Sequence, residues 1–240
     1  MSTLLTNLRA YWKFDESSGN PVDSSGNAYT LTNNNTVNFN ASLISNGADF
    51  GSANTNKTFT TSSTLGISVD TAMSFAGWVN ITTSPSSGTA YAIMGLGFDA
   101  SDVFYVFEYG NFSGTRRFRV GRARNGVDDP SMLYTTTLTT GTWYHIAYTI
   151  DASRNQEFYL DGVRQANNTA VSGNGSGTTF TGTVFSRALF ADARHLSGKV
   201  DEWGVWDKVL SSSEITELYN GGLGLSYPFL GNKRGIVSYF

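Results

Sequence analysis

The chain has no cysteine, and its 240 residues include only two histidines, His145 and His195. The lack of cysteine excludes a disulfide framework, a cysteine nucleophile and any zinc site that needs thiolates, and two histidines are too few for a histidine-rich metal cluster. Long apolar runs are also missing. The longest stretch without a charged residue, 71–98, is interrupted by the polar segment 82–89, so it predicts two strands and a loop and no membrane helix.

Charged residues are scarce as well, and the net charge is slightly negative. The chain has 16 Lys and Arg against 19 Asp and Glu, a net charge of −3, and charged residues make up 15% of the total. This balance argues against nucleic acid as a partner. Residues 1–9 lack a charged segment followed by an apolar one, so no signal peptide is expected and export by the usual route is not predicted for a complete chain.

Polar residues that favour strands and turns are abundant. The chain contains 28 Ser, 28 Thr, 20 Asn and 26 Gly, with only 4 Pro. Threonine favours pleated, half-buried surfaces, whereas Asn, Gly and Ser favour tight turns. With 40% hydrophobic and 14% aromatic residues, the composition supports a folded core. Many short strands joined by turns are therefore predicted.

Apolar alternation locates the strands and one helix. The expected strands cover 10–14, 73–81, 90–96, 103–109, 117–121, 143–150, a hairpin at 157–164 and 199–206. The hairpin turns at Asp161-Gly162, a pair that tolerates positive φ. Ser211 and Glu214 have capping-box spacing, which predicts one helix that ends at Gly221-Gly222. The residues after Gly222 lack this pattern of alternating strands and turns. We therefore expect them to form an extension that packs on the domain or on a neighbouring molecule.

Several of these segments, in this order, resemble a known family. The resemblance is carried by LRAYWKFDE (8–16), DSSGN (23–27), SFAGWV (74–79), TWYHIA (142–147), YLDG (159–162), GKVDEWGVWDKVLS (198–211) and LYNGG (218–222). Together they resemble laminin-G-like domains of the concanavalin A-like lectin/glucanase group. The resemblance implies an all-β fold: a two-sheet antiparallel jelly-roll sandwich with one short C-terminal helix, whose first and last strands are adjacent. It predicts one domain over 1–222 and a C-terminal extension over 223–240.

Relatives with this fold include lectins, glucan hydrolases, adhesion modules and structural domains, so the fold leaves the function open. A glycosidase needs two carboxyl groups close together. Asp201 and Asp207 share a strand face but lie about 20 Å apart along the strand, and Glu202 is expected to point the other way. Glu108 stands alone on its strand. No catalytic residue is assigned, and glucan hydrolysis is kept as the least favoured alternative.

A calcium site is the sharpest prediction for a cofactor. Asp23 and Asn27 lie in a turn where carbonyl oxygens converge, and Asp201 begins the last strand. The resemblance implies that the first and last strands adjoin, and several family members hold calcium there. We therefore expect a structural Ca²⁺ at Asp23, Asn27 and Asp201. The alternative is an Asx turn at Asp23 and a structural hydrogen bond at Asp201.

Four residues are candidates for ligand binding. Trp78 and Asn80 share a strand face and offer a ring with an amide beside it, although core packing is the alternative for each tryptophan. Arg117 and Arg119 belong to a segment, 116–124, with five arginines. They can bind anionic glycans or phosphates through paired hydrogen bonds, or they can simply deter pairing at an exposed strand. His145 can bind a sugar hydroxyl or be bonded inside the sheet.

These observations favour a non-catalytic binding or adhesion module, with a glycan or surface polysaccharide as ligand. The alternative is a structural virion component, such as a phage capsid decoration, head-fibre or tail protein that contacts other subunits through 223–240. That alternative rests on the absent signal peptide and cysteine, the one-domain length and the apolar tail. Either role predicts a virion or extracellular surface as the location, without nucleic acid and without membrane insertion.

Overall fold

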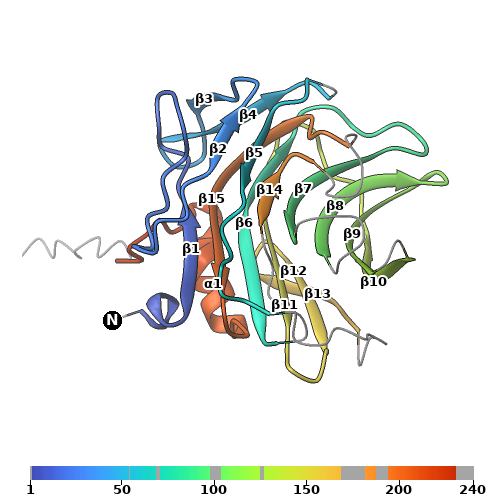
Figure 1. Ribbon diagram of the computed structural model, residues 1–240. Coiled ribbons are helices and arrows are strands. Elements are labelled where there is room, and N and C mark those ends of the chain that lie inside the picture. Colours follow the sequence, from blue (N-terminus) through green and yellow to red (C-terminus); the bar gives the residue numbers. More distant parts are fainter. Residues whose placement is uncertain are drawn as a thin grey trace, which may run out of the picture.

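Two antiparallel sheets pack face to face in a computed structural model of the chain (Figure 1). The structure describes residues 2–53, 55–68, 71–97, 104–124, 127–168, 182–187 and 194–230. Both sheets consist of antiparallel neighbours, and one short α-helix near the C-terminus accompanies them. The all-β jelly-roll sandwich with one C-terminal helix, predicted from sequence, is therefore confirmed.

The first sheet, called sheet A, contains the first and last strands of the domain. Its order is β13 (Val163–Asn168), β12 (Gln156–Leu160), β11 (Trp143–Ile150), β6 (Met73–Ile81), β15 (Gly198–Trp206), β4 (Asn46–Gly51) and β3 (Asn38–Ala41). Strand β1 (Leu8–Trp12) pairs with the second half of β15, on the edge where β4 pairs with the first half. The first and last long strands therefore lie side by side.

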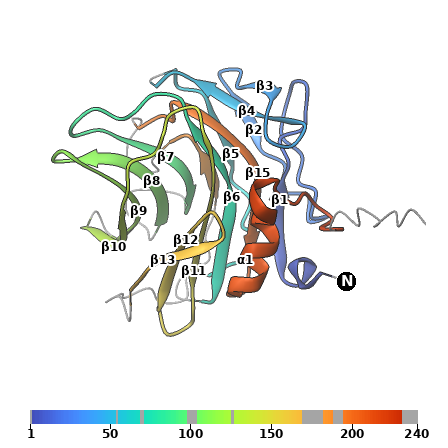
Figure 2. The same cartoon turned by 180° about the vertical axis from the view of Figure 1, so that it is seen from behind.

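The second sheet, called sheet B, covers one face of sheet A with seven strands. Its order is β10 (Val127–Thr135), β9 (Thr115–Arg124), β8 (Phe104–Phe112), β7 (Ala90–Leu96), β14 (Thr183–Phe185), β5 (Thr58–Thr61) and β2 (Thr32–Asn34). The strands β7, β8 and β9 are visibly curved in the two opposite views (Figures 1 and 2).

Periodicity predicted the long strands and missed most of the short ones. The bounds of β6, β7 and β11 agree with the expected ranges, and Asp161 and Gly162 form the hairpin turn with φ of 50° and 77°. The strands β2, β3, β4, β5, β10 and β14 were not expected. Five of them are short or rich in Asn, Thr and Gly, so they lack the repeated apolar alternation that marks a half-buried strand. The sixth, β10, has nine residues, but Asp128, Asp129 and Pro130 interrupt its alternation.

The main core lies between the two sheets and consists largely of aromatic rings. Phe75 of β6 contacts Phe107 of β8 edge to face, with ring centroids 5.7 Å apart. Trp203 of β15 meets Phe107 and Phe185 at 6.4 and 5.7 Å. These contacts join sheet A to sheet B through side chains that alternate along each strand, as a sandwich requires.

A second apolar cluster covers the outer face of sheet A. Helix α1 (Ser212–Tyr219) and the segment after it lie on this face; the helix is behind β6 in Figure 1 and in the foreground in Figure 2. Tyr11, Trp206 and Phe229 form its aromatic part, and the ring centroids of Tyr11 and Phe229 are 5.1 Å apart. Consequently every residue of β6 is buried, on both faces of the strand.

The first part of the predicted C-terminal extension packs on its own domain. Residues 223–230 follow the short 3₁₀ turn η2 (Asn220–Gly222), and Leu225 and Phe229 are buried against sheet A. Residues 231–240, the part of the extension that is expected to contact other subunits, lie outside the described residues. No helix within the described ranges is long and apolar enough to cross a membrane.

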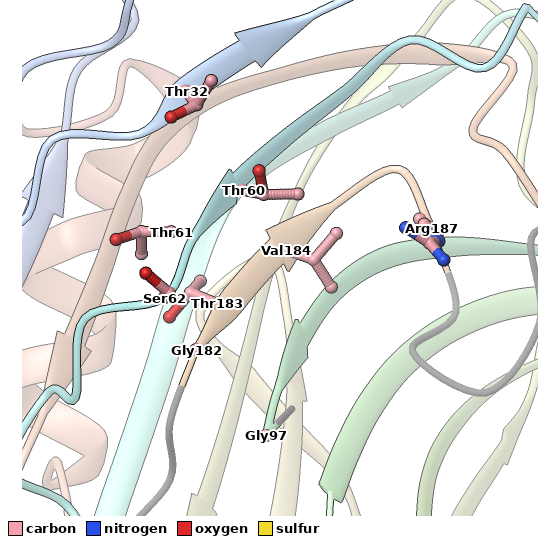
Figure 3. A pocket seen from close by; sticks show the side chains of 9 residues that line it. All are labelled: Thr32, Thr60, Thr61, Ser62, Gly97, Gly182, Thr183, Val184 and Arg187. Carbon is pink, nitrogen blue, oxygen red and sulfur yellow. The ribbon is translucent and has the colours of Figure 1, made fainter. Parts of the chain in front are cut away.

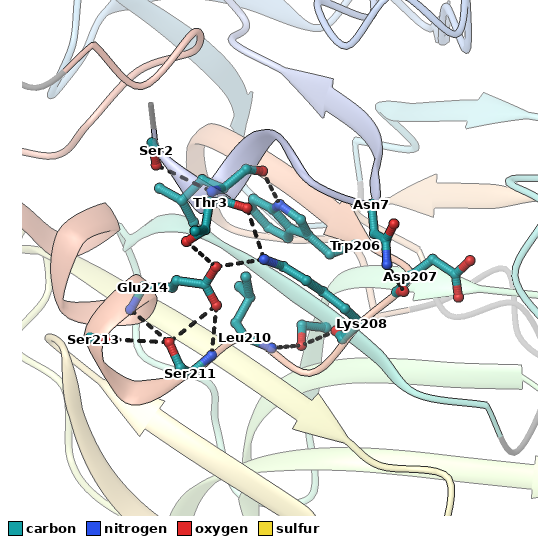
Figure 4. A network of polar contacts seen from close by, with 12 residues as sticks. Ser2, Thr3, Asn7, Trp206, Asp207, Lys208, Leu210, Ser211, Ser213 and Glu214 are labelled. Carbon is teal, nitrogen blue, oxygen red and sulfur yellow. Dashed lines mark hydrogen bonds and ion pairs between the residues drawn. The ribbon is translucent and has the colours of Figure 1, made fainter.

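A polar network joins helix α1 to the N-terminal 3₁₀ turn η1 (Thr3–Leu5) (Figure 4). Ser211 and Glu214 form the expected capping box, in which Glu214 N–H donates to Ser211 Oγ at 3.2 Å and Ser211 N–H donates to the Glu214 carboxylate at 2.9 Å. Thr3 Oγ1 and Lys208 Nζ donate to the other carboxylate oxygen at 2.6 and 2.5 Å. Burial alone would raise the pKa of Glu214, but these donors outweigh it and lower the pKa to about 2.

Glu214→Gln should destabilise the protein by about 1 to 3 kcal/mol, because the charge-assisted bonds to Lys208, Thr3 and Ser211 lose their acceptor charge. Urea unfolding at pH 7 measures this loss. Because the folded-state pKa is depressed, the wild-type advantage should be complete above the ordinary Glu pKa and disappear as the pH falls towards 2. Glu217→Gln, an exposed change on the same helix, is the control. Equal losses of unfolding free energy in Glu214→Gln and Glu217→Gln would contradict a stabilising role of this network.

Candidate functional site

A buried glutamate organises two arginines on the outer face of sheet B. Glu108 of β8 is fully buried, and Arg119 of β9 donates to its Oε2 from Nε at 2.9 Å and from Nη2 at 2.6 Å. Arg194 donates to Oε1 from Nη1 at 2.5 Å. Both carboxylate oxygens are thus engaged by guanidinium groups, which fixes the two arginines on the sheet.

Phe112 and Arg117 extend this cluster along β8 and β9. The guanidinium carbons of Arg117 and Arg119 lie 4.8 and 5.1 Å from the centroid of the Phe112 ring, within range of cation–π attraction. We call Glu108, Phe112, Arg117, Arg119 and Arg194 the arginine patch. Its three arginines and one glutamate leave an excess of two positive charges.

A groove of about 390 Å³ borders this patch. We call it the histidine groove; it is lined by Ala53, Ser86, Gly88, Thr89, Ala90, Tyr91, Arg194 and His195. The His195 ring is 2% exposed, and its Nδ1 lies 2.9 Å from the Ser186 carbonyl oxygen. A carbonyl only accepts, so Nδ1 carries the proton, and in the neutral ring Nε2 is an acceptor that has no partner within the described part of the chain.

The groove and the patch form one continuous surface. Arg194 lines the groove and also pairs with Glu108. Ala90, another lining residue, lies opposite Gly110 of β8 in the strand register. A Cβ on Gly110 would meet the Phe112 ring at 2.6 Å and the Ala90 Cβ at 2.7 Å, so the glycine lets Phe112 lie against the sheet beside the groove.

A second groove, of about 380 Å³, is lined by β2, β5 and β14 (Figure 3). We call it the threonine groove; its lining is Thr32, Thr60, Thr61, Ser62, Gly97, Gly182, Thr183, Val184 and Arg187. Hydroxyl groups gather where Thr61 pairs with Thr183, and Arg187 lies at the other end, beyond Val184. The lining has hydrogen-bonding groups and no aromatic ring, which makes it a weaker match to a saccharide than the histidine groove.

The predicted candidates Trp78 and Asn80 are buried on the outer face of sheet A, and Trp78 lies under helix α1. Trp78 is 2% exposed and stacks on Tyr219 of the helix, with ring centroids 5.8 Å apart. Asn80 Nδ2 donates to the Gly141 carbonyl at 2.9 Å. His145 packs against Trp78 and Tyr219, and burial lowers its pKa to about 3. These side chains fill the interior on this side and present no surface to a glycan.

Among the predicted metal ligands, Asp23 already accepts hydrogen bonds with both of its carboxylate oxygens. Its Oδ1 accepts from the backbone N–H groups of Tyr11 and Ser25, each at 2.9 Å, and its Oδ2 accepts from Ser25 Oγ and Tyr29 N–H at 2.8 and 3.1 Å. Asn27 Nδ2 donates to the Arg9 carbonyl at 2.9 Å. Four donors point at the Asp23 carboxylate, which is the geometry of an Asx turn and leaves no lone pair directed at a cation.

Asp201 lies in a different environment, beside Glu202. A β-bulge places Glu202 and Trp203 opposite a single residue of β6, and Glu202 has a φ of 52°. Because of this extra residue, Glu202 faces outward with Asp201 and Trp203 faces the core. The expectation that Glu202 points away from Asp201 was therefore wrong, since it assumed a regular strand.

The two carboxyl groups are buried and only partly satisfied. Asp201 Oδ2 accepts from Ser42 Oγ at 2.8 Å and Ile44 N–H at 3.0 Å, whereas Asp201 Oδ1 and both Glu202 oxygens have no partner in hydrogen-bonding geometry. Burial raises the pKa of Asp201 to about 8, with the Glu202 charge adding to the rise. Burial also raises the pKa of Glu202 to about 7, although the Tyr11 and Ser226 hydroxyl groups beside its carboxylate act to lower it.

Unpartnered carboxylate oxygens side by side are the donors that a hard cation prefers. Asp201 and Glu202 fit that requirement, and Asp23 does not. The described residues contain no cluster of three or more His, Cys, Asp or Glu placed to hold a metal ion, so backbone or water oxygens would have to complete such a site. This pair came together through the bulge, which the residue pattern did not reveal.

Arg117 and Arg119 of the arginine patch are among the residues that the sequence predicted for ligand binding, whereas the histidine groove was not predicted. The groove joins the polar loop 82–89, the start of β7 and the residues Arg194 and His195, which are about one hundred residues apart along the chain. Neither histidine carries a motif. The one available signal was the Ser-rich loop, and it predicts a turn as readily as a binding site.

Comparison with known families gives one match. A laminin G-type model, described as the concanavalin A-like lectin/glucanases superfamily, matches residues 50–216, which is more than half of the chain. No curated protein sequence matches the chain.

Several solved structures share the fold. A structure of botulinum neurotoxin type C, described as interacting with two ganglioside molecules, has a TM-score of 0.71 at 13% identity, covering 92% of this chain and 52% of that one. The binding domain of Paraclostridial Mosquitocidal Protein 1 has a TM-score of 0.69 at 16% identity, with coverages of 91% and 53%. This chain thus spans about half the length of the toxin chains.

Domain 4 of AbnA, an extracellular arabinanase of Geobacillus stearothermophilus solved with arabinotriose, matches over almost its whole length. The TM-score is 0.64 at 18% identity, covering 88% of this chain and 97% of that domain. At these identities the likeness establishes the fold.

Without divalent cations, the protein should lose stability as the pH rises from 5 to 8. Asp201 and Glu202 bind protons more tightly in the folded chain than in the unfolded one, where such groups titrate near pH 4, so deprotonation favours unfolding. The slope should reach at most about 1.4 kcal/mol per pH unit for each carboxyl group. Urea unfolding at pH 5, 6, 7 and 8 measures it. Asp201→Asn should flatten the profile and Glu217→Gln should not; equal wild-type stability at pH 5 and 8 would refute the account.

Proposed function

Because the chain belongs to the concanavalin A-like lectin/glucanases superfamily, we propose that it is a non-catalytic module that binds a saccharide in the histidine groove. Such a module would act at an extracellular or virion surface, where glycans are displayed. The observation that carries the proposal is the groove itself, which combines hydroxyl groups, a tyrosine and a buried histidine nitrogen without a partner.

The chemistry of the groove suits a sugar better than an apolar ligand. Ser86 and Thr89 are exposed and supply hydroxyl groups at the rim of the groove. Tyr91 and His195, which are 7% and 2% exposed, form its buried wall, and His195 Nε2 is an acceptor without a partner in the described part of the chain. The volume of about 390 Å³ is within the range of small-ligand sites. The likeness to an arabinanase domain solved with arabinotriose supports the choice of a saccharide.

The acidic residues support binding rather than hydrolysis. Glycosidases need one carboxyl group as acid and a second as base or nucleophile, both facing the sugar. Both oxygens of Glu108 are bonded to arginines, and Asp201 and Glu202 are buried on the outer side of the other sheet. None of the three is in position to act on a saccharide in the histidine groove.

Ser86→Tyr should weaken saccharide binding at least about tenfold, because a large side chain then occupies the groove. A glycan array that includes arabinotriose identifies a ligand, and isothermal titration calorimetry measures its affinity. Ser87→Tyr, at the next exposed loop residue, is the matched control and should bind normally. Thr60→Tyr fills the threonine groove instead. Loss of binding in Thr60→Tyr but not in Ser86→Tyr would place the saccharide site in the threonine groove. If no glycan binds at all, the proposal is overturned.

We also propose that a structural Ca²⁺ binds at Asp201 and Glu202. Their unpartnered oxygens support this assignment, and they lie on sheet A, away from the histidine groove on sheet B. A bound cation would compensate two buried negative charges and thereby favour the folded chain.

Calcium at a hundredfold excess over its Kd should raise the Tm by about 5 to 10 °C relative to chelator, as expected for roughly 2.7 kcal/mol in a chain of this size. Thermal melting in calcium and in chelator tests this. Asp201→Asn should abolish the shift. Asp23→Asn should lower the Tm through loss of its turn but retain the shift. A wild-type Tm that calcium does not change would refute the site.

A further inference from the structure

We propose that the saccharide carries an anionic substituent, a carboxylate or a sulfate, and that Arg117 binds it at the edge of the histidine groove. This inference rests on the proposed function and adds the chemical class of the ligand. Figures 1 and 2 show the surface concerned, the outer side of the curved strands β7, β8 and β9.

Arg117 is the arginine of the patch whose charge is not compensated. No acidic side chain of the described ranges forms an ion pair with it, and its Nε has no hydrogen-bond partner. Its guanidinium group lies over the Phe112 ring at 4.8 Å and the side chain is partly exposed. A planar guanidinium held over a ring presents its N–H groups in a fixed fork, which matches the two oxygens of a carboxylate or sulfate.

The neighbouring arginines hold this arrangement in place. Glu108 fixes Arg119 and Arg194 through three bonds of 2.5 to 2.9 Å, and Arg119 lies 5.1 Å from the same Phe112 ring. One buried carboxylate therefore orients two guanidinium groups without neutralising the cluster. The excess of two positive charges remains next to the groove.

The charge of the patch is opposite to that of the whole chain. The protein carries a net charge of −3, so its overall field repels anions. A local excess of positive charge on such a protein attracts an anionic group at one place without making the whole surface attractive to polyanions. Arg194 lines the groove and belongs to the patch, so a sugar in the groove can direct a substituent towards Arg117.

A nucleic acid is a poorer match to the same surface. Proteins that bind single strands stack bases on exposed aromatic rings. In the patch, the Phe112 ring is already engaged by two guanidinium groups, and it is the patch's one aromatic residue. The saccharide is therefore the ligand that the surface favours, and a phosphate-bearing strand becomes an outcome of the test.

Calorimetric titration of the whole chain with three oligosaccharide probes, and with a single-stranded DNA oligonucleotide for comparison, tests the inference. The probes are a galacturonic acid trisaccharide, a sulfated heparin tetrasaccharide and neutral arabinotriose, each at two salt concentrations. We expect one charged probe to bind at least about tenfold more tightly than arabinotriose, and its affinity to fall as salt rises. The stronger of the two charged probes distinguishes carboxylate from sulfate.

Arg117→Gln should remove the preference for the charged probe by about tenfold, with a smaller change in arabinotriose affinity and a Tm lower by no more than a few °C, since it also loses the contact with Phe112. Arg117→Lys should restore part of it, since lysine retains the charge but not the fork. The matched control is Arg164→Gln on sheet A, which removes the same charge from an exposed arginine paired with Glu157.

Three results would overturn the inference. If arabinotriose binds as tightly as both charged probes, the proposed function stands but the inference that the ligand is anionic is refuted. An equal loss of affinity for the charged probe in Arg117→Gln and Arg164→Gln would show that the attraction between charges is non-specific. Tighter binding of a single-stranded oligonucleotide than of every saccharide would replace the ligand class. Failure of all saccharides in the array and the titrations would instead refute the proposed function itself.

Discussion

The packing of Trp203 between the two sheets is the contact on which the rest of the structure depends. Its ring lies against Gly77 of β6, where a Cβ would approach the indole to 2.4 Å, and its Nε1 donates to the Trp78 carbonyl at 3.0 Å. The ring then reaches Phe107 and Phe185 of the opposite sheet. A large-to-small change at such a site typically costs 3 to 5 kcal/mol, roughly a third or more of a domain's stability. The bulge at Glu202 accompanies this packing and turns two carboxyl groups to the other side of the strand.

The two sheets use their outer faces differently. On sheet A, Trp78 and Trp206 are covered by helix α1, by η1 and by residues 223–229, so that face is a second core. On sheet B, the outer face carries arginines, and two grooves border this sheet. Aromatic residues are therefore concentrated where the chain packs on itself, and polar and cationic groups remain where a ligand can approach. This asymmetry explains why the tryptophans, attractive as sugar platforms in the sequence, do not form the candidate site.

Glu108 illustrates how a buried charge can serve binding rather than stability. A fully buried carboxylate loses its hydration, and ion pairs recover that loss only when the geometry is good. Here two guanidinium groups satisfy both oxygens, and the arginines gain fixed positions beside Phe112. A rigid cationic surface loses less conformational entropy when it binds an anion than a set of mobile arginines would.

The local sequence determined those strands, turns and helix ends that depend on residues close together in the chain. The alternation in 73–81 and 143–150 gave strands with the observed bounds, Asp161-Gly162 gave the hairpin turn, and Ser211 with Glu214 gave the helix start, because each depends on neighbours within a few residues. Tertiary structure decided which outer face is free, the closeness of Asp201 and Glu202, and the joining of the loop 82–89 to His195. These depend on the bulge, on the helix that covers sheet A, and on contacts between residues about one hundred positions apart, and no periodicity in the chain encodes such distances.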